Sequence, residues 1–229
     1  MRSVTPDARL RAAAGFVRQG ARLADIGTDH AYLPVSLLRG GRIPFAVASD
    51  ISAGPLAHAC ETAAFAEIGE DRLALVLTPG LRGIEAYHPT DITICGMGGE
   101  MIVGILADAP FVRDPNIRLI LQPMTRAHIL RRYLAENGFA ITSETLARVK
   151  RHVYTCLCVH YTGESYPLSP LDACLGAYYT RGQGREHPLF PAYIEEQIST
   201  VRRRVFGLRS VGAAGEEDEK MLAEMEAYL

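Results

Sequence analysis

Residues 139–161 read FAITSETLARVKRHVYTCLCVHY and decide the fold class. Two segments rich in β-branched and apolar residues, 139–149 and 152–161, face each other across Lys150 and Arg151. Two residues are too few for a crossover helix, so the two segments must form antiparallel strands. This stretch therefore predicts a β-hairpin.

Five short apolar runs precede this hairpin and alternate with helical segments. Such an alternation is typical of parallel strands that are buried on both faces of a sheet. We expect strands at 21–26, 45–49, 73–77, 92–95 and 118–122, with helices from Pro34 to about Leu38, from Pro55 to Ile68 before Gly69, after Gly99, and up to Asn137. The predicted fold is α/β: a doubly wound, Rossmann-like sheet of five β/α units with an antiparallel terminal hairpin.

The pattern changes after the hairpin. Residues 162–170 are rich in turn formers and indicate a linker. Apolar residues then recur at spacings of three and four from Phe190 to Leu208 and again from Met221 to Leu229, which predicts a small, coiled-coil-like helical hairpin. We divide the chain into a first domain, 1–164, and a linker with helical hairpin, 165–229. We expect the helical hairpin to pack on itself, so that a chain ending at Pro170 still folds.

Composition limits the class of protein. Of the 229 residues, 48% are hydrophobic and 22% are charged, which excludes disordered and collagen-like chains. No apolar run approaches the roughly 20 residues of a membrane span, and the first residues lack the apolar stretch of a signal peptide. Five irregularly spaced cysteines do not indicate a disulfide framework. We expect a cytoplasmic protein without a membrane partner.

Charge is distributed unevenly, although the net charge is only −2. Residues 113–151 carry eight basic and three acidic side chains, whereas residues 215–229 carry one and six. All the cations except Lys150 and Lys220 are arginines, whose planar guanidinium suits phosphate better than an ammonium does.

The most unusual residues stand where the first two predicted strands end. In open α/β sheets, ligands bind beyond the carboxyl ends of the strands. The first strand ends in DIGTDH (25–30), where Gly27 lets the backbone approach a ligand closely, and the second ends in Asp50, which can accept the hydroxyls of a ribose. These residues indicate a cofactor that contains adenosine.

The loop after the first strand favours S-adenosylmethionine over NAD. It lacks the Gly-x-Gly-x-x-Gly pattern that holds a pyrophosphate, because no glycine follows Gly27 until Gly40. Asp25 and Asp29 would repel the phosphates of a dinucleotide, whereas the sulfonium and amino groups of S-adenosylmethionine are cationic.

Three strings, ADIGTDHAYLP (24–34), ICGMGG (94–99) and LILQP (119–123), resemble the bacterial tRNA (adenine-N1) methyltransferases that modify adenine 22 of the D-arm. The resemblance extends from about residue 8 to the C-terminus. It implies a class I methyltransferase fold, S-adenosylmethionine as the methyl donor, tRNA as the partner, and a small coiled-coil domain after the catalytic one.

The resemblance also implies site residues. Asp25, Gly27, Asp29 and His30 match the family's first cofactor loop, and Asp50 matches its ribose-binding acid. The block Gly96, Met97, Gly98 and Gly99 would lie beside the methyl group and let the target base approach. Where the family usually has Gly-Asp-Gly, this chain has Thr78-Pro79-Gly80, so the cofactor's adenine would be read by backbone groups near Gly80 and Leu81.

Docking of tRNA requires cations that contact phosphates. We expect these contacts from Arg126, Arg131, Arg132, Lys150, Arg151 and Arg203. The acidic residues of the second C-terminal helix should turn outward or pair with Arg202, Arg203 and Arg204 of the first. The target base must be unstacked to reach the pocket, at a cost of a few kcal/mol. The oligomeric state stays open, with a monomer favoured.

We predict no catalytic role for the cysteines and no bound metal. Cys156, Cys158 and His160 share one strand face but lack a second pair of ligands at zinc-site spacing, so we expect no metal. We interpret Cys95 as a packing residue. Alternative functions are methylation of another RNA or of a small molecule, a non-catalytic RNA-binding module with a vestigial cofactor pocket, and, less well supported, a dehydrogenase.

Overall fold

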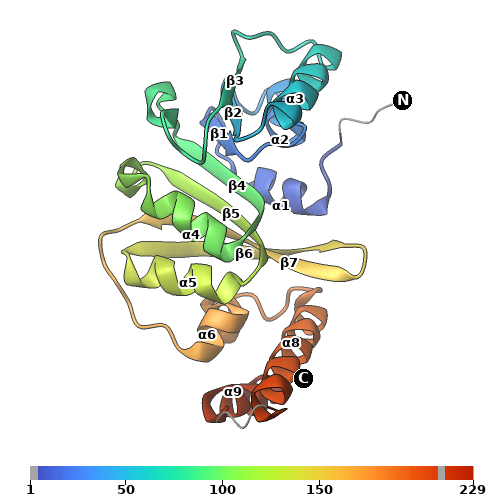
Figure 1. The fold of residues 1–229 in the computed structure, drawn as a ribbon, viewed down its shortest axis with the longest axis vertical. Helices are drawn as coiled ribbons and strands as arrows, with labels where there is room; N and C mark the ends of the chain where they lie inside the picture. The colour runs from blue at the N-terminus through green and yellow to red at the C-terminus, as the bar shows by residue number, and fades with distance from the viewer. Residues whose placement is uncertain (1–4, 211–214, 229) are drawn as a thin grey trace.

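A computed structural model describes residues 5–210 and 215–228, with side-chain surroundings for all of these except 208–210 (Figure 1). Seven strands form one sheet in the order β3-β2-β1-β4-β5-β7-β6. Their bounds are β1 Arg22–Ile26, β2 Phe45–Asp50, β3 Leu73–Leu77, β4 Asp91–Gly98, β5 Arg118–Thr125, β6 Phe139–Val149 and β7 His152–Tyr161. The first five strands are parallel, and β7 runs antiparallel to both β5 and β6. The predicted doubly wound sheet with an antiparallel terminal hairpin is confirmed.

Helices cover both faces of this sheet. Helices α1 (Ala8–Phe16), α2 (Tyr32–Arg39) and α3 (Ala53–Phe65) bury apolar side chains on one face, and α4 (Gly99–Ala107) and α5 (Ala127–Glu136) bury theirs on the other. Each face therefore has its own hydrophobic cluster, as a parallel sheet requires. A 3₁₀ turn, η2 (Pro110–Arg113), precedes β5.

Two details differ from the sequence expectation. Helix α3 ends at Phe65 rather than Ile68, because Glu67 adopts the left-handed conformation (φ 57°) directly after the C-cap Ala66. The connection between β3 and β4 contains only the 3₁₀ turn η1 (Ile84–Tyr87), so four of the five expected β/α units have a full helix.

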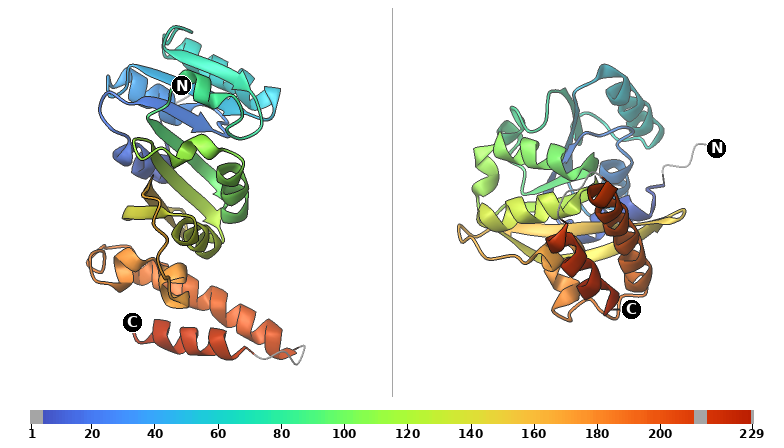
Figure 2. Two further views of the ribbon diagram at one scale, coloured as in Figure 1. Left: turned by 90° about the vertical axis from the view of Figure 1, so that its left-hand side faces the viewer. Right: turned by 60° about the horizontal axis from the view of Figure 1, so that its bottom comes forward.

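The C-terminal helices pack on the sheet domain as well as on each other. They comprise α6 (Pro170–Leu175), α7 (Ala177–Thr180), α8 (Phe190–Ser210) and α9 (Glu216–Glu226), and they lie beneath the β6–β7 end of the sheet (Figure 2). Leu146 of β6 and Val153 of β7 belong to the same buried cluster as the apolar residues of α8, which include Phe190, Ile194, Ile198 and Val201. The helical hairpin therefore packs on the terminal β-hairpin as well as on itself. Independent folding of a chain that ends at Pro170 stays a prediction.

Ion pairs join the two C-terminal helices. Arg202 lies 2.6 Å from Glu226, and Arg204 lies 2.5 Å from Asp218. The acidic helix α9 thus pairs with arginines of α8, which was one of its two predicted arrangements.

Among the described helices, none is both long enough and apolar enough to cross a membrane.

Candidate functional site

A cavity of about 390 Å³ opens at the carboxyl end of β1. Its walls come from the N-terminal end of α1, the loop between β1 and α2, and the last part of β4. The cavity brings together Asp25, Gly27, Asp29 and His30, which were predicted as cofactor residues, and Gly96, which was predicted as a catalytic residue. A ligand site at this edge of an α/β sheet is the expected position.

Asp25 is the buried acid of this cavity. Its side chain is held at the end of β1, where only 7% of the residue is exposed, and its Oδ1 accepts a hydrogen bond of 2.7 Å from the hydroxyl of Thr93. Burial raises the pKa of the carboxyl group, although hydrogen bonds from Thr93 and Thr28 oppose the rise. A buried carboxylate with few partners is well suited to a cationic ligand.

Gly27 allows the first loop to meet the Gly-Met-Gly-Gly block. Its φ is +71°, and a Cβ on it would lie 1.9 Å from the Cε atom of Met97. The backbone N–H groups of Gly27 and Thr28 donate to the carbonyl oxygen of Ser49, which ties the loop to the end of β2. A side chain at position 27 would therefore displace Met97 or the loop.

The glycines of the block serve different purposes. A Cβ on Gly99 would lie 2.4 Å from the carbonyl oxygen of Arg126, and one on Gly98 would lie 3.3 Å from Oγ1 of Thr125, so both permit close packing of α4 on the end of β5. Gly96 has φ +82° and open space around its Cβ position, with only Arg9 at 4.0 Å. Of the three glycines, only Gly96 lines the cavity. Gly96 therefore lines the cavity, while Gly98 and Gly99 serve the packing of α4. Access of a target base through this block stays a prediction.

Helix α1 supplies a wall of the cavity that the sequence did not reveal. Asp7 caps this helix by accepting hydrogen bonds from the N–H groups of Arg9 and Leu10, and its Oδ2 also lies 2.7 Å from Nη2 of Arg9. The guanidinium of Arg9 continues to Gln122, whose Oε1 accepts from Arg9 Nη1 at 3.3 Å and from the backbone N–H of Gly96 at 3.2 Å. The guanidinium of Arg9, paired with Asp7, thus lies beside Gly96.

Asp50 stands at the neighbouring strand end. It is the last residue of β2, is half-buried, and accepts a hydrogen bond of 2.7 Å from the N–H of Ser52. It does not line the 390 Å³ cavity. Because β1 and β2 are parallel neighbours, Asp50 lies at the same edge of the sheet as the loop after β1.

Gly80 and Leu81 lie apart from the first cavity. They line a second one of about 740 Å³, formed between the segment after β3 and helix α4, together with Pro79, Met101 and Ile105. A Cβ on Gly80 would lie 3.3 Å from Ile105, and the side chain of Leu81 is buried. Only the backbone groups of Gly80 and Leu81 are therefore candidates to contact the adenine of the cofactor, and this contact stays a prediction.

Cys95 lines the first cavity but is chemically quiet. Burial raises the pKa of its thiol well above the ordinary value, and the nearby Cys156 and Asp25 raise it further. A protonated thiol is a poor nucleophile and a poor base, which agrees with a packing role.

Arg131 corrects one prediction outright. Its side chain is fully buried, forms an ion pair of 2.8 Å with Glu144, and donates to the carbonyl oxygens of Ala173 and Cys174. A guanidinium enclosed in this way cannot reach a phosphate. The alternation of charged and apolar residues in α5 did not reveal this, because the partners lie in β6 and α6.

The other predicted phosphate contacts are accessible. Arg126 is exposed and pairs with Glu100. The other four predicted contacts that are exposed are Arg132, Lys150, Arg151 and Arg203. The guanidinium of Arg203 donates hydrogen bonds to Ser199 and Thr200 of its own helix. These residues are spread over α5, the β6–β7 turn and α8.

Known proteins are similar to this chain in sequence and in fold. The profile of the methyltransferase-domain family matches residues 7–157. The tRNA (adenine(22)-N(1))-methyltransferase of Bacillus subtilis (strain 168) is 32% identical over 149 residues, which are 65% of this chain. The match spans 62% of the length of that relative.

Solved structures extend the similarity to nearly the whole chain. Streptococcus pneumoniae Sp1610, assigned as a tRNA (m1A22) methyltransferase, has a TM-score of 0.81 at 30% identity, covering 98% of this chain and 97% of that one. Its complex with S-adenosyl-L-methionine has a TM-score of 0.78 at 31% identity and covers 96% of both chains. The chain therefore belongs to the methyltransferase-domain family and, within it, to the tRNA (adenine-22-N1)-methyltransferases.

Proposed function

We propose that this protein methylates N1 of an adenine in tRNA, at position 22 of the D-arm, with S-adenosylmethionine as the donor. The observation that carries the proposal is the cavity at the end of β1, where the buried Asp25, the crowded Gly27 and Gly96 meet in a chain of this family. A tRNA substrate also implies an enzyme of the cytoplasm.

The charges around the cavity fit the proposed donor. S-adenosylmethionine supplies an electrophilic methyl group on a sulfonium centre, together with an ammonium and a carboxylate. Asp25 and Asp29 provide negative charge for the cationic groups, and Arg9 provides positive charge for the carboxylate. We assign the ribose hydroxyls to Asp50, because it ends the strand next to β1.

The chain's own residues align the reaction and exclude water. Adenine N1 already carries an in-plane lone pair, so its attack on a methyl group needs no strong base. The cavity offers none from Cys95, whose thiol stays protonated. Gly96 gives a target base access, and Gln122 holds the backbone of Gly96 in place.

The test combines binding and modification. An Asp50→Ala variant should bind S-adenosylhomocysteine about 1.5–3 kcal/mol more weakly in calorimetry, because it loses hydrogen bonds to a charged group. A Glu70→Ala variant, which changes an exposed acid before β3, is the matched control and should bind normally. An unchanged affinity of Asp50→Ala for S-adenosylhomocysteine would show that Asp50 does not bind the cofactor.

Mapping of methylated bases then identifies the substrate. Transcribed tRNA incubated with the protein and labelled donor should carry the label on N1 of adenine 22. A label on another base or molecule would favour a different methyltransferase. Binding of S-adenosylhomocysteine without any methyl transfer would favour an RNA-binding module.

A further inference from the structure

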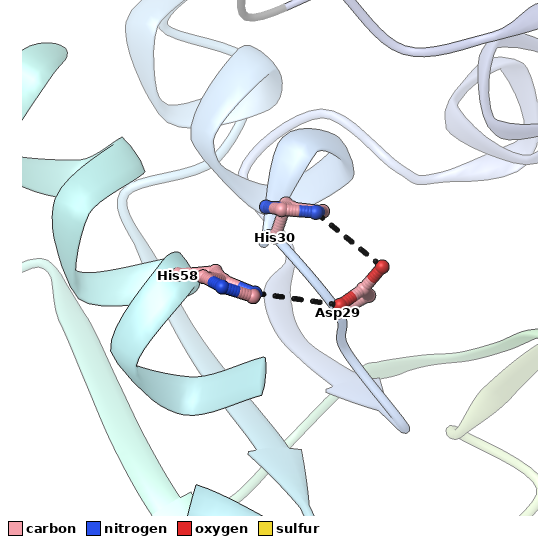
Figure 3. A group of neighbouring side chains, drawn as sticks. All are labelled: Asp29, His30 and His58. Atoms are coloured by element: carbon pink, nitrogen blue, oxygen red, sulfur yellow. Dashed lines mark ion pairs between the residues drawn. The ribbon is translucent and has the colours of Figure 1, made fainter. Parts of the chain in front are cut away.

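Two histidines and one aspartate converge beside the cavity (Figure 3). Nε2 of His30 lies 3.4 Å from Oδ2 of Asp29, and Nδ1 of His58 lies 3.8 Å from Oδ1 of the same carboxylate. One ligand atom from each of the three residues lies within 4.8 Å of the others. His58 had no role in the sequence prediction, because it is far from the first loop along the chain.

The fold holds the two halves of this trio in place. Asp29 and His30 belong to the tight loop after β1, in which Gly27 and Ala31 have positive φ values of 71° and 52°. The N–H of Ala31 donates to Oγ1 of Thr28 at 3.1 Å, which closes the loop. His58 projects from α3, and its carbonyl oxygen accepts from the hydroxyl of Thr62 one turn later. The trio therefore joins one loop and one helix that follow neighbouring strands.

The imidazole rings are ordered by stacking. The ring of His30 lies between those of Tyr32 and His58, with centroid distances of 4.9 and 4.7 Å and nearly parallel planes. Figure 3 shows a nitrogen of each imidazole directed towards the Asp29 carboxylate, from two different elements. Because the two imidazole rings stack nearly parallel, their in-plane nitrogens can meet at one ion only when one ring tilts out of the stack, and both side chains are partly exposed.

We propose that Asp29, His30 and His58 bind one first-row divalent transition-metal ion, with Zn²⁺ as its representative. Two imidazole nitrogens and one carboxylate oxygen form a common zinc ligand set. Bonds of about 2.0–2.1 Å in a tetrahedral site place the ligand atoms about 3.3–3.4 Å apart. The spacing of 3.4 Å between His30 and Asp29 Oδ2 matches this value, whereas His58 lies 3.8 Å from the other carboxylate oxygen and must move closer to bind the same ion. The side chains are 74% (Asp29), 35% (His30) and 49% (His58) exposed, so water can complete the coordination.

The donor set also sets the selectivity. Mg²⁺ and Ca²⁺ prefer oxygen ligands, whereas imidazole nitrogen suits zinc, copper and nickel. With two nitrogens and one carboxylate, the trio binds Zn²⁺ and does not hold Mg²⁺ at comparable concentrations.

Occupation of this site affects the neighbouring cavity. Asp29 and His30 line that cavity, whereas His58 does not. A bound cation neutralises the Asp29 carboxylate. The effect on the methyl donor rests on the proposed function, in which Asp29 is part of the pocket for a cationic donor. Zn²⁺ therefore weakens the binding of S-adenosylmethionine.

Calorimetric titration of the metal-free full-length protein with ZnCl₂ tests the site without any methyl donor. We expect one ion per chain, and a loss of affinity of at least tenfold in His58→Ala. His152→Ala is the matched control, because His152 also lies 3.8 Å from a carboxylate, that of Glu196, but belongs to no trio among the described residues. Cys60→Ser tests the exposed thiol that lies two residues after His58. Both control variants should bind Zn²⁺ as the unchanged protein does.

Three results would overturn the proposal: no Zn²⁺ binding by the unchanged protein, equal binding by His58→Ala, or loss of binding in Cys60→Ser. Imidazole ¹⁵N spectra supply a second readout, in which Zn²⁺ should shift the signals of two of the seven histidines. Shifts spread over the other histidines would also contradict the site. Because these measurements use no donor and no tRNA, they can succeed even if the protein does not methylate tRNA. The effect on S-adenosylmethionine is measured separately, and it should vanish in His58→Ala.

Discussion

The carboxyl group of Asp25 lies in surroundings that oppose its charge. Burial raises its pKa above the usual 3.8, so the folded chain holds this proton more tightly than the unfolded chain does. The stability that protonation contributes is complete below pH 3.8 and is lost as the pH rises through the raised, folded-state pKa. Ionisation of Asp25 therefore destabilises the fold, while the charge of the carboxylate serves ligand binding.

An Asp25→Asn variant should separate these two effects. Its melting temperature should exceed that of the unchanged protein at pH 7.5, and the difference should shrink as the pH falls to 4. Its affinity for S-adenosylmethionine should fall, because the cationic groups lose their buried partner. Asp29→Asn, at a largely exposed position, should change the melting temperature at pH 7.5 less than Asp25→Asn does. A lower melting temperature for Asp25→Asn at pH 7.5 would show that the carboxylate stabilises the fold.

At the scale of elements, α5 is joined to β6 and α6 through one buried guanidinium. Burial alone would lower the pKa of Arg131, but Glu144 raises it, so the guanidinium stays charged. Arg131→Ala leaves Glu144 buried without its partner and should cost about 3–5 kcal/mol in urea unfolding. Arg132→Ala, its exposed neighbour, should change stability by less than about 0.5 kcal/mol. Arg131→Met combined with Glu144→Leu should recover most of the loss, and a failure to recover would mean that the pair has a role beyond mutual neutralisation.

At the scale of the whole molecule, the C-terminal helices complete the hydrophobic core. We therefore expect a chain that ends at residue 164 to expose Leu146 and Val153 and to leave Arg131 without the carbonyl oxygens of α6. Calorimetry of this shortened chain should show a lower melting temperature or aggregation, contrary to the independence that the sequence suggested. A shortened chain with the original melting temperature would show that residues 1–164 fold as a separate unit.

The exposed cations make a second prediction at this scale. If Arg132 and Arg151 each contact a tRNA phosphate, replacing both with Gln should flatten the log–log salt dependence of tRNA affinity by about 1.8 units. The affinity for S-adenosylmethionine should stay the same, because neither residue lines the cavity. An unchanged slope with normal folding would exclude both residues from the docking surface. A Glu164→Gln variant controls for the general effect of removing an exposed charge.

Local patterns explain what the sequence could predict. The strands and the hairpin turn were recognisable because their signals lie within a few residues of one another, and the acids at the ends of β1 and β2 follow directly from strand positions. The contact of Arg9 with Gln122 joins residues 113 positions apart, and Arg131 meets α6 carbonyl groups 42 and 43 positions away. Apolar periodicity in α8 showed that one face is buried, but it contained no information about the β-hairpin that this face covers.

The packing of α8 on the terminal β-hairpin also affects how the protein is made. Val153 leaves the ribosome about 50 residues before Val201, which belongs to the same buried cluster. At about 5–20 residues per second, synthesis of that span takes roughly 3–10 seconds. During this interval the apolar side chains of β6 and β7 that α8 covers in the folded protein have no partner from α8. The growing polypeptide is therefore most open to chaperones, and to association with other nascent chains, in the interval before α8 emerges.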